Sequence, residues 1–174
     1  LLERGADPNR NNIFGHLPLT LAARHGHVEM ISVLIARKAK VNMESRTGGR
    51  IALVEACRFN HPEVVRKLIA FNDTSVNIET RSEMAMHLTP LVAIAFFNSI
   101  DCIEPIMKSL NWTTGNRNGV ELYKETCEMI SPIGACIMKG HIEMTKAILK
   151  YMHLKCADDN LLKERNARRL FCNA

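Results

Sequence analysis

The chain has 174 residues and a formal net charge of +5, and it contains 47% hydrophobic and 24% charged residues. This length and composition predict one folded domain with a sizeable core, and they exclude disordered and collagen-like classes. There is no run of about 18 apolar residues, so we expect no membrane-spanning helix. The start of the chain also lacks the pattern of a signal peptide, which favours a cytoplasmic or nuclear location.

The charge distribution and the cysteine spacing argue against a nucleic-acid-binding protein and against a disulfide-bonded one. Residues 1–70 and 139–174 are basic, whereas residues 71–138 are acidic. An acidic middle opposes a continuous line of phosphate contacts, so we do not expect a nucleic-acid partner. None of the six cysteines has C-x-x-C spacing, and we expect free thiols that are mostly buried.

The predicted elements repeat along the chain. Residues 1–9, LLERGADPN, look like the end of an earlier unit of a longer protein. Four units follow, each with an apolar heptapeptide and then a pentapeptide: LPLTLAA (17–23) and GHVEM (26–30), IALVEAC (51–57) and NHPEV (60–64), TPLVAIA (89–95) and NSIDC (98–102), SPIGACI (131–137) and GHIEM (140–144). Steps of 34, 38 and 42 residues separate the heptapeptides, and this spacing indicates a repeat architecture.

Each heptapeptide predicts a short first helix. Proline suits the first turn of a helix because its missing N–H would be unpaired there anyway, and three units have one: Pro18, Pro90 and Pro132. Thr89 and Ser131, directly before two of these prolines, are good N-cap residues.

The pentapeptide begins with the residue that we expect to end this helix. Only Gly or Asn stands there, the two residue types that best tolerate the left-handed conformation: Gly26, Asn60, Asn98 and Gly140. Apolar pairs one turn apart then predict a second helix with one buried face: Met30, Ile31, Leu34 and Ile35; Val64, Val65, Leu68 and Ile69; Cys102, Ile103, Ile106 and Met107; Met144, Thr145, Ile148 and Leu149.

These residues carry a family resemblance. LPLTLAARHGHVEMISVLI followed by KVN resembles the ankyrin repeat, whose pattern is TPLHLAA-x-x-GH-x-E-VV-x-LL-x-x-GADVN. The resemblance covers the chain to about residue 155 and implies an all-α solenoid of stacked antiparallel helix pairs with short hairpin-like fingers. Two departures imply irregular stacking. The family's first-helix His is replaced by Thr20, Val54, Val92 and Gly134, and Pro105 falls in or near the first turn of a second helix.

The resemblance also divides the chain. It implies the end of a preceding repeat at 1–12, repeats at 13–46, 47–84, 85–126 and 127–157, and a C-terminal capping helix or the start of a next segment at 158–174. The repeat at 85–126 is divergent, with a long insertion at about 110–128 that contains Trp112. The capping helix would begin at Asp158 or Asp159.

The repeated His-x-Glu pair has two interpretations. A metal or catalytic site needs side chains that converge, and separate repeats a helix diameter apart do not bring them together. A scaffold position after a helix end explains His27, His61 and His141 at once, with each imidazole bonded to nearby backbone. His25 and His27 have no acidic or Cys partner in register. We therefore expect no metal, no cofactor and no enzymatic activity.

Partner contacts are expected from the two positions before each Gly or Asn, because in the family these positions face the concave surface. They are Arg24 and His25, Arg58 and Phe59, Phe96 and Phe97, and Met138 and Lys139, with Trp112 of the insertion as a further candidate. Exposed Phe and Arg are residue types that anchor interfaces. The alternative for Phe96 and Phe97 is that they fill the core of a divergent unit.

The function that follows is a non-catalytic protein–protein interaction module, a scaffold or adaptor. It would bind another protein or a peptide, partly acidic, and no small-molecule substrate. The alternative is the substrate-recruitment domain of a larger enzyme such as a ubiquitin ligase, a kinase or a palmitoyltransferase. A third possibility is a spacer without a specific partner.

Overall fold

The computed structural model describes residues 6–71, 89–109 and 131–158, and the side chains of these residues up to 151. Every regular element within these ranges is helical. The helices are α1 (Pro18–Arg24), α2 (Val28–Ala36), α3 (Ala52–Arg58), α4 (Pro62–Ala70), α5 (Pro90–Phe97), the 3₁₀ turn η2 (Ile100–Cys102), α6 (Ile103–Ser109), α8 (Pro132–Lys139) and α9 (Ile142–Asp158).

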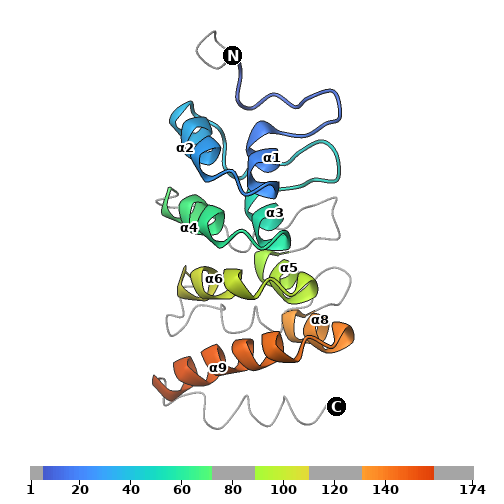
Figure 1. The fold of residues 1–174 in the computed structure, drawn as a ribbon, viewed down its shortest axis with the longest axis vertical. Helices are drawn as coiled ribbons and strands as arrows, with labels where there is room; N and C mark the ends of the chain where they lie inside the picture. Colours follow the sequence, from blue (N-terminus) through green and yellow to red (C-terminus); the bar gives the residue numbers. More distant parts are fainter. Residues whose placement is uncertain (1–5, 72–88, 110–130, 159–174) are drawn as a thin grey trace.

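The helices stack in two layers, as Figure 1 shows. In one layer α1 packs on α3, α3 on α5 and α5 on α8; in the other α2 packs on α4, α4 on α6 and α6 on α9. Each first helix also packs against the second helix of its own pair, for example α1 against α2. The predicted all-α solenoid of helix pairs is therefore confirmed.

Caps and prolines start the first helices as predicted. The hydroxyl of Thr89 accepts a hydrogen bond from the amide of Val92 at 3.3 Å, and that of Ser131 accepts one from Gly134 at 3.0 Å. Each cap precedes a proline in the first turn of its helix. Such a cap satisfies an amide that has no partner within the helix.

The Gly and Asn residues end the first helices in the left-handed conformation. Their φ angles are +73° at Gly26, +57° at Asn60, +58° at Asn98 and +71° at Gly140, so this prediction is confirmed in all four units. The next amide then bonds back to a carbonyl five residues earlier in each unit: His27 to Ala22, His61 to Ala56, Ser99 to Ile94 and His141 to Cys136, at 2.9–3.0 Å. This pattern of a left-handed residue with a returning amide closes the exposed end of a helix.

The predicted core is confirmed except at two positions. Ile31, Leu68 and Ile106 are buried within the second-helix layer, as are most of the apolar residues predicted to lie there. Met30 and Leu149, however, are 48% and 46% exposed. They lie on α2 and α9, the second helices at the two ends of the described stack, so each lacks the neighbouring described helix that covers its equivalents.

The second helix of the third unit begins differently from the others. A 3₁₀ turn over Ile100–Cys102 leads directly into α6, and Pro105 is the third residue of α6. The missing N–H of Pro105 thus falls in the first turn, as expected. At the C-terminal end α9 runs to Asp158, and the rest of the predicted capping helix or next segment, residues 159–174, lies outside the described residues. The insertion at 110–128 lies outside them as well.

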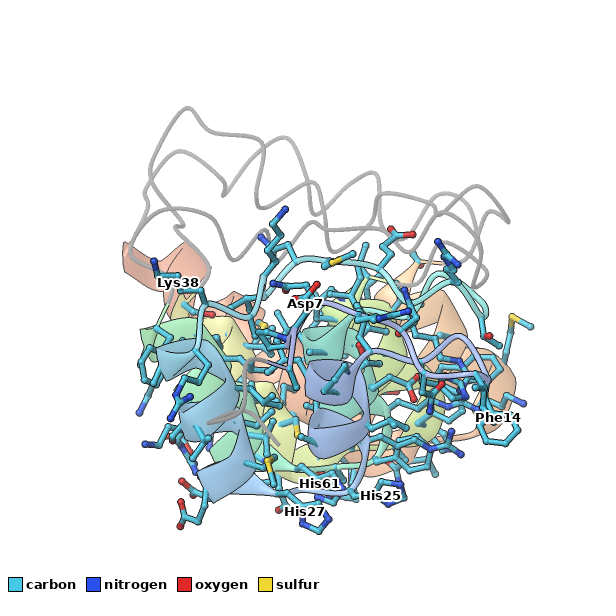
Figure 2. The ribbon with its side chains drawn as sticks, turned by 90° about the horizontal axis from the view of Figure 1, so that it is seen from above. Asp7, Phe14, His25, His27, Lys38 and His61 are labelled. Atoms are coloured by element: carbon cyan, nitrogen blue, oxygen red, sulfur yellow. The ribbon has the colours of Figure 1, made fainter. Side chains whose placement is uncertain are left out.

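Two loops project beside the first-helix layer, and we call residues 10–16 the first finger and residues 43–50 the second finger. The side-chain oxygen of Asn12 accepts hydrogen bonds from the amides of Phe14 and His16 at 3.0 and 2.9 Å. The two fingers are joined by the amide of Thr47, which donates to the carbonyl of Gly15 at 3.1 Å. Figure 2 looks along the stack and places Phe14 at the outer end of a finger, away from His61.

Candidate protein-binding surface

The ends of the first helices bring together most of the residues predicted to contact a partner. Each helix ends at or next to one of them, so stacking the helices places residues from successive repeats side by side. The residues that meet are Arg24 of α1, Arg58 and Phe59 at the end of α3, Phe96 and Phe97 of α5, and Lys139 of α8.

Cations and rings alternate along this line. The guanidinium carbon of Arg24 lies 5.0 Å from the ring centroid of Phe59. The guanidinium carbon of Arg58 lies 5.3 Å from the same ring and 4.8 Å from the ring of Phe97. Each such contact stabilises by about 0.5–1 kcal/mol where water has access. Arg58 therefore bridges two rings from neighbouring repeats.

The line continues into the fourth unit. The rings of Phe97 and Phe96 meet edge to face with centroids 5.1 Å apart, and the Nζ of Lys139 lies 4.3 Å from the centroid of Phe96. One unbroken series of contacts thus crosses all four helix pairs. We call Arg24, Phe59, Arg58, Phe97, Phe96 and Lys139 the cation–aromatic ladder.

The two adjacent phenylalanines of α5 have different surroundings. Phe97 is 37% exposed, similar to Phe59 at 38%. Phe96 is half-buried and packs against the hydrophobic core. The two interpretations offered by the sequence therefore divide between them: Phe96 has a core role, and Phe97 presents its ring to solvent.

Two predicted contact residues stand apart from the ladder, and the structure does not describe a third. His25 is exposed and stacks on His27 with ring centroids 6.0 Å apart, and Figure 2 shows both at one edge of the stack near His61. Met138 is 69% exposed on α8. Trp112 lies outside the described residues.

Two charged residues next to the ladder were missed by the sequence argument. The carboxylate of Glu55 on α3 lies 3.6 Å from Nη1 of Arg58 and 4.0 Å from Nη1 of Arg50 in the second finger. Glu55 is buried, with only 2% of its surface exposed. A signal was present, because Leu21, Ala93 and Ala135 hold the equivalent position in the other units and Glu55 alone is charged there.

Comparison with known proteins agrees with this architecture. A family model described as "Ankyrin repeats (3 copies)" matches residues 1–81. Residues 1–81 are therefore identified as ankyrin repeats. The same two-layer stacking continues through α5, α6, α8 and α9, beyond the matched residues.

Several ankyrin-repeat relatives are much longer proteins. The chain is 35% identical over 96 residues to the E3 ubiquitin-protein ligase XBAT33 of Arabidopsis thaliana, and 38% identical over 72 residues to the mouse ankyrin repeat and SOCS box protein 16. It is 26% identical over 150 residues to the human transient receptor potential cation channel subfamily A member 1. These matches cover 54%, 41% and 86% of the chain, but only 18%, 15% and 13% of the respective relatives.

Two of the three histidines that follow helix ends, His61 and His141, bond to the neighbouring repeat, whereas His27 is exposed. Nε2 of His61 lies 3.0 Å from the carbonyl oxygen of Arg24, and Nδ1 of His141 lies 3.0 Å from that of Ala95. Each imidazole therefore donates to the first helix of the neighbouring ankyrin repeat. Within the described residues, no three His, Cys, Asp or Glu side chains come together as a metal ion would require.

The cysteines with described side chains are buried and free: Cys57, Cys102 and Cys136. Burial raises the pKa of all three thiols, and with the nearby negative charge of Asp101 it raises the pKa of Cys102 to about 12. A protonated, buried thiol is a poor nucleophile, so these residues act as small core side chains. Cys127, Cys156 and Cys172 lie outside the described side chains.

The helices of the described ranges include none that is both long and apolar enough to cross a membrane.

Proposed function

We propose that this chain is a non-catalytic protein-interaction module that recognises a partly acidic protein or peptide through the cation–aromatic ladder. The observation that carries this proposal is the unbroken series of ring and cation contacts from Arg24 to Lys139, which spans four helix pairs. Ankyrin repeats are a protein-interaction fold. The choice of surface and of partner chemistry is our proposal, as is a location in the cytosol or nucleus.

The geometry supports binding for an energetic reason. Arg and aromatic side chains carry much of the energy at protein interfaces when they are anchored before the partner arrives. The rings of Phe59 and Phe97 hold Arg58 from two sides, which reduces the rotamer entropy that binding would cost. The cations remain partly exposed, so acidic groups of a partner can still reach them.

A second candidate is the substrate-recruitment domain of a larger ubiquitin ligase. It is favoured by the relative named as an E3 ubiquitin-protein ligase, whose match covers 54% of this chain. In either candidate the residues described here bind a protein and perform no chemistry, and we propose no cofactor or small-molecule substrate for them. The kinase and palmitoyltransferase contexts have no comparable support.

The test compares the ladder with an equivalent ring elsewhere. Phe97→Ala removes a ladder ring, whereas Phe71→Ala removes a ring on the other helix layer that is 47% exposed and has its own cation, with Nζ of Lys67 at 5.9 Å. Proteins cross-linked to the wild-type chain in a cell extract are identified by quantitative mass spectrometry. The amount of each specific partner should be close to the wild-type amount with the Phe71→Ala chain and about tenfold lower with the Phe97→Ala chain.

The control for folding is the thermal unfolding of both variants. Equal recovery of every partner by wild-type, Phe97→Ala and Phe71→Ala chains would remove the ladder as the binding surface. If no protein is recovered above background with any of the chains, the spacer interpretation is favoured instead.

A further inference from the structure

Arg50, Glu55 and Arg58 form a charged cluster where the second finger meets α3. The two oxygens of the Glu55 carboxylate face different arginines: Oε1 is 3.6 Å from Nη1 of Arg58, and Oε2 is 4.0 Å from Nη1 of Arg50. Both distances are longer than a hydrogen bond. The carboxylate therefore attracts the two guanidinium groups without using up their N–H donors.

The cluster has unmet bonding capacity. The Glu55 side chain is 3% exposed, and its Oε2 accepts no hydrogen bond from any described residue. The side chains of Arg50 and Arg58 are 27% and 35% exposed, and each guanidinium group carries five N–H donors in a planar fork. Two positive charges face one negative charge, so one positive charge remains uncompensated within the cluster.

Both arginines are anchored, Arg58 through its side chain and Arg50 through its backbone. Arg58 lies against the rings of Phe59 and Phe97. The carbonyl oxygen of Arg50 accepts hydrogen bonds from the amide of Ser45 at 3.0 Å and from the hydroxyl of Thr20 at 3.5 Å, which fixes the end of the second finger next to α1. The guanidinium group of Arg58 is therefore held against two rings, and the backbone that carries the Arg50 side chain is fixed. Both side chains lie next to Glu55 and are partly exposed.

We propose that Arg50 and Arg58 form a clamp that binds a side-chain carboxylate of the partner, and that Glu55 is the positioning residue that holds the clamp together. This inference rests on the proposed function, since it specifies which chemical group of the partner binds at one position of the same surface. An arginine fork matches the two oxygens of a carboxylate, and two forks can grip one carboxylate from both sides.

The charge balance favours a carboxylate over a phosphate. A carboxylate neutralises the single uncompensated charge of the cluster. A phosphorylated side chain carries about two negative charges and would add repulsion next to the buried Glu55. Arg24 lies over the same Phe59 ring and attracts acidic groups to this end of the ladder, but the clamp itself consists of the two arginines that share Glu55.

The experiment uses the full chain and a random linear peptide library displayed on phage. Peptides enriched on the wild-type chain are synthesised, and fluorescence anisotropy gives the Kd of each acidic peptide, of its Glu→Gln or Asp→Asn form, and of the form with phosphoserine at that position. We expect Arg50→Gln and Arg58→Gln each to weaken the acidic peptide about tenfold and the amide peptide less than twofold. The matched control is Arg46→Gln, which removes an exposed charge from the same finger and should change neither Kd by more than twofold.

Glu55→Gln supplies a readout that a purely structural role would not move. The amide is almost the same size, but the cluster then carries two uncompensated positive charges. The phosphoserine peptide should gain about threefold or more in affinity relative to the carboxylate peptide. An unchanged ratio would show that Glu55 does not set the charge of the site.

The clamp is overturned if the enriched peptides contain no acidic residue, or if Arg46→Gln weakens binding as much as Arg50→Gln does. It is also overturned if the acidic and amide peptides lose affinity equally. If in these cases Phe97→Ala still weakens the enriched peptides, the proposed function stands without the clamp. If Phe97→Ala has no effect either, the ladder is not the binding surface and both proposals fail.

Discussion

Nε2 of His61 lies 3.0 Å from the carbonyl oxygen of Arg24 and binds one ankyrin repeat to the next. His61 precedes α4, whereas Arg24 is the last residue of α1, so the bond joins the turn of one repeat to the first helix of its neighbour. The carbonyl can only accept, so Nε2 carries the proton. The same Arg24 extends its side chain over Phe59, which connects the scaffold to the ladder at a single residue.

Replacing His61 should destabilise the stack, whereas replacing His27 should not. His61→Ala removes a partly buried bond between repeats and leaves a carbonyl without its partner, at an expected cost of about 1–2 kcal/mol in the free energy of unfolding. His27 occupies the equivalent position but is exposed, so His27→Ala should cost less than about 0.5 kcal/mol. Urea denaturation of both variants measures the difference. Equal losses would contradict a bonding role for His61.

Gly26 and Gly140 offer a matched pair of substitutions. Both have a φ near +70°, where alanine costs about 1 kcal/mol relative to glycine. A Cβ on Gly140 would meet nothing within 4 Å, whereas one on Gly26 would lie 2.7 Å from Nδ1 of His61. Gly26→Ala should therefore cost at least about 1 kcal/mol more than Gly140→Ala, because His61 must give up its bond.

A double-mutant cycle checks this explanation. In a His61→Ala background the ring is absent, so the cost of Gly26→Ala should fall to that of Gly140→Ala in the wild-type chain. The free energies come from the same urea curves. If the extra cost of Gly26→Ala persists without the ring, a cause other than the contact with His61 must explain it.

The contribution of each hydroxyl cap to stability should be measurable by a single substitution. Thr89→Ala and Ser131→Ala each remove the acceptor for one helix amide, and each should lower the free energy of unfolding by about 1 kcal/mol. Thr89→Ser and Ser131→Thr keep the hydroxyl and serve as controls that should retain most of the stability. Thermal unfolding followed by circular dichroism gives the ranking. A control as unstable as its alanine variant would rule out the cap as the cause.

Stability should decline in alkaline solution because of Cys102. Burial, helped by the charge of Asp101, raises the pKa of this thiol to about 12, whereas in the unfolded chain it is about 8.5. The unfolded state therefore loses its proton first as the pH rises. The contribution is fully present below about pH 8.5 and declines toward pH 12, by at most about 1.4 kcal/mol per pH unit.

The control for this alkaline loss of stability is the Cys102→Ala variant. That variant should be less stable at neutral pH, because it lacks the buried sulfur, but its stability should fall less steeply between pH 8.5 and 10.5. Free energies of unfolding at a series of pH values give both slopes. Parallel curves for the two proteins would show that Cys102 ionises as easily in the folded chain as in the unfolded one.

The sequence alone determined the helices and their ends. The Gly or Asn at the end of each first helix, the hydroxyls of Thr89 and Ser131 and the position of Pro105 are local signals, because each acts on backbone within one turn of itself. The spacing of the apolar residues likewise predicted which faces of the second helices are buried. It could not predict that Met30 and Leu149 are exposed, because their burial depends on a neighbouring helix and not on their own.

Only the tertiary structure decided how the side chains of different repeats meet. The sequence placed Arg24, Phe59 and Phe97 at candidate contact positions, but which cation lies over which ring depends on the offset between stacked helices and on the rotamers of long side chains. The pairing of Glu55 with Arg50 depends in addition on where the second finger ends. Contacts within a helical turn are set by nearest neighbours in the chain, whereas contacts between repeats are set by packing, and the packing decided the candidate binding site.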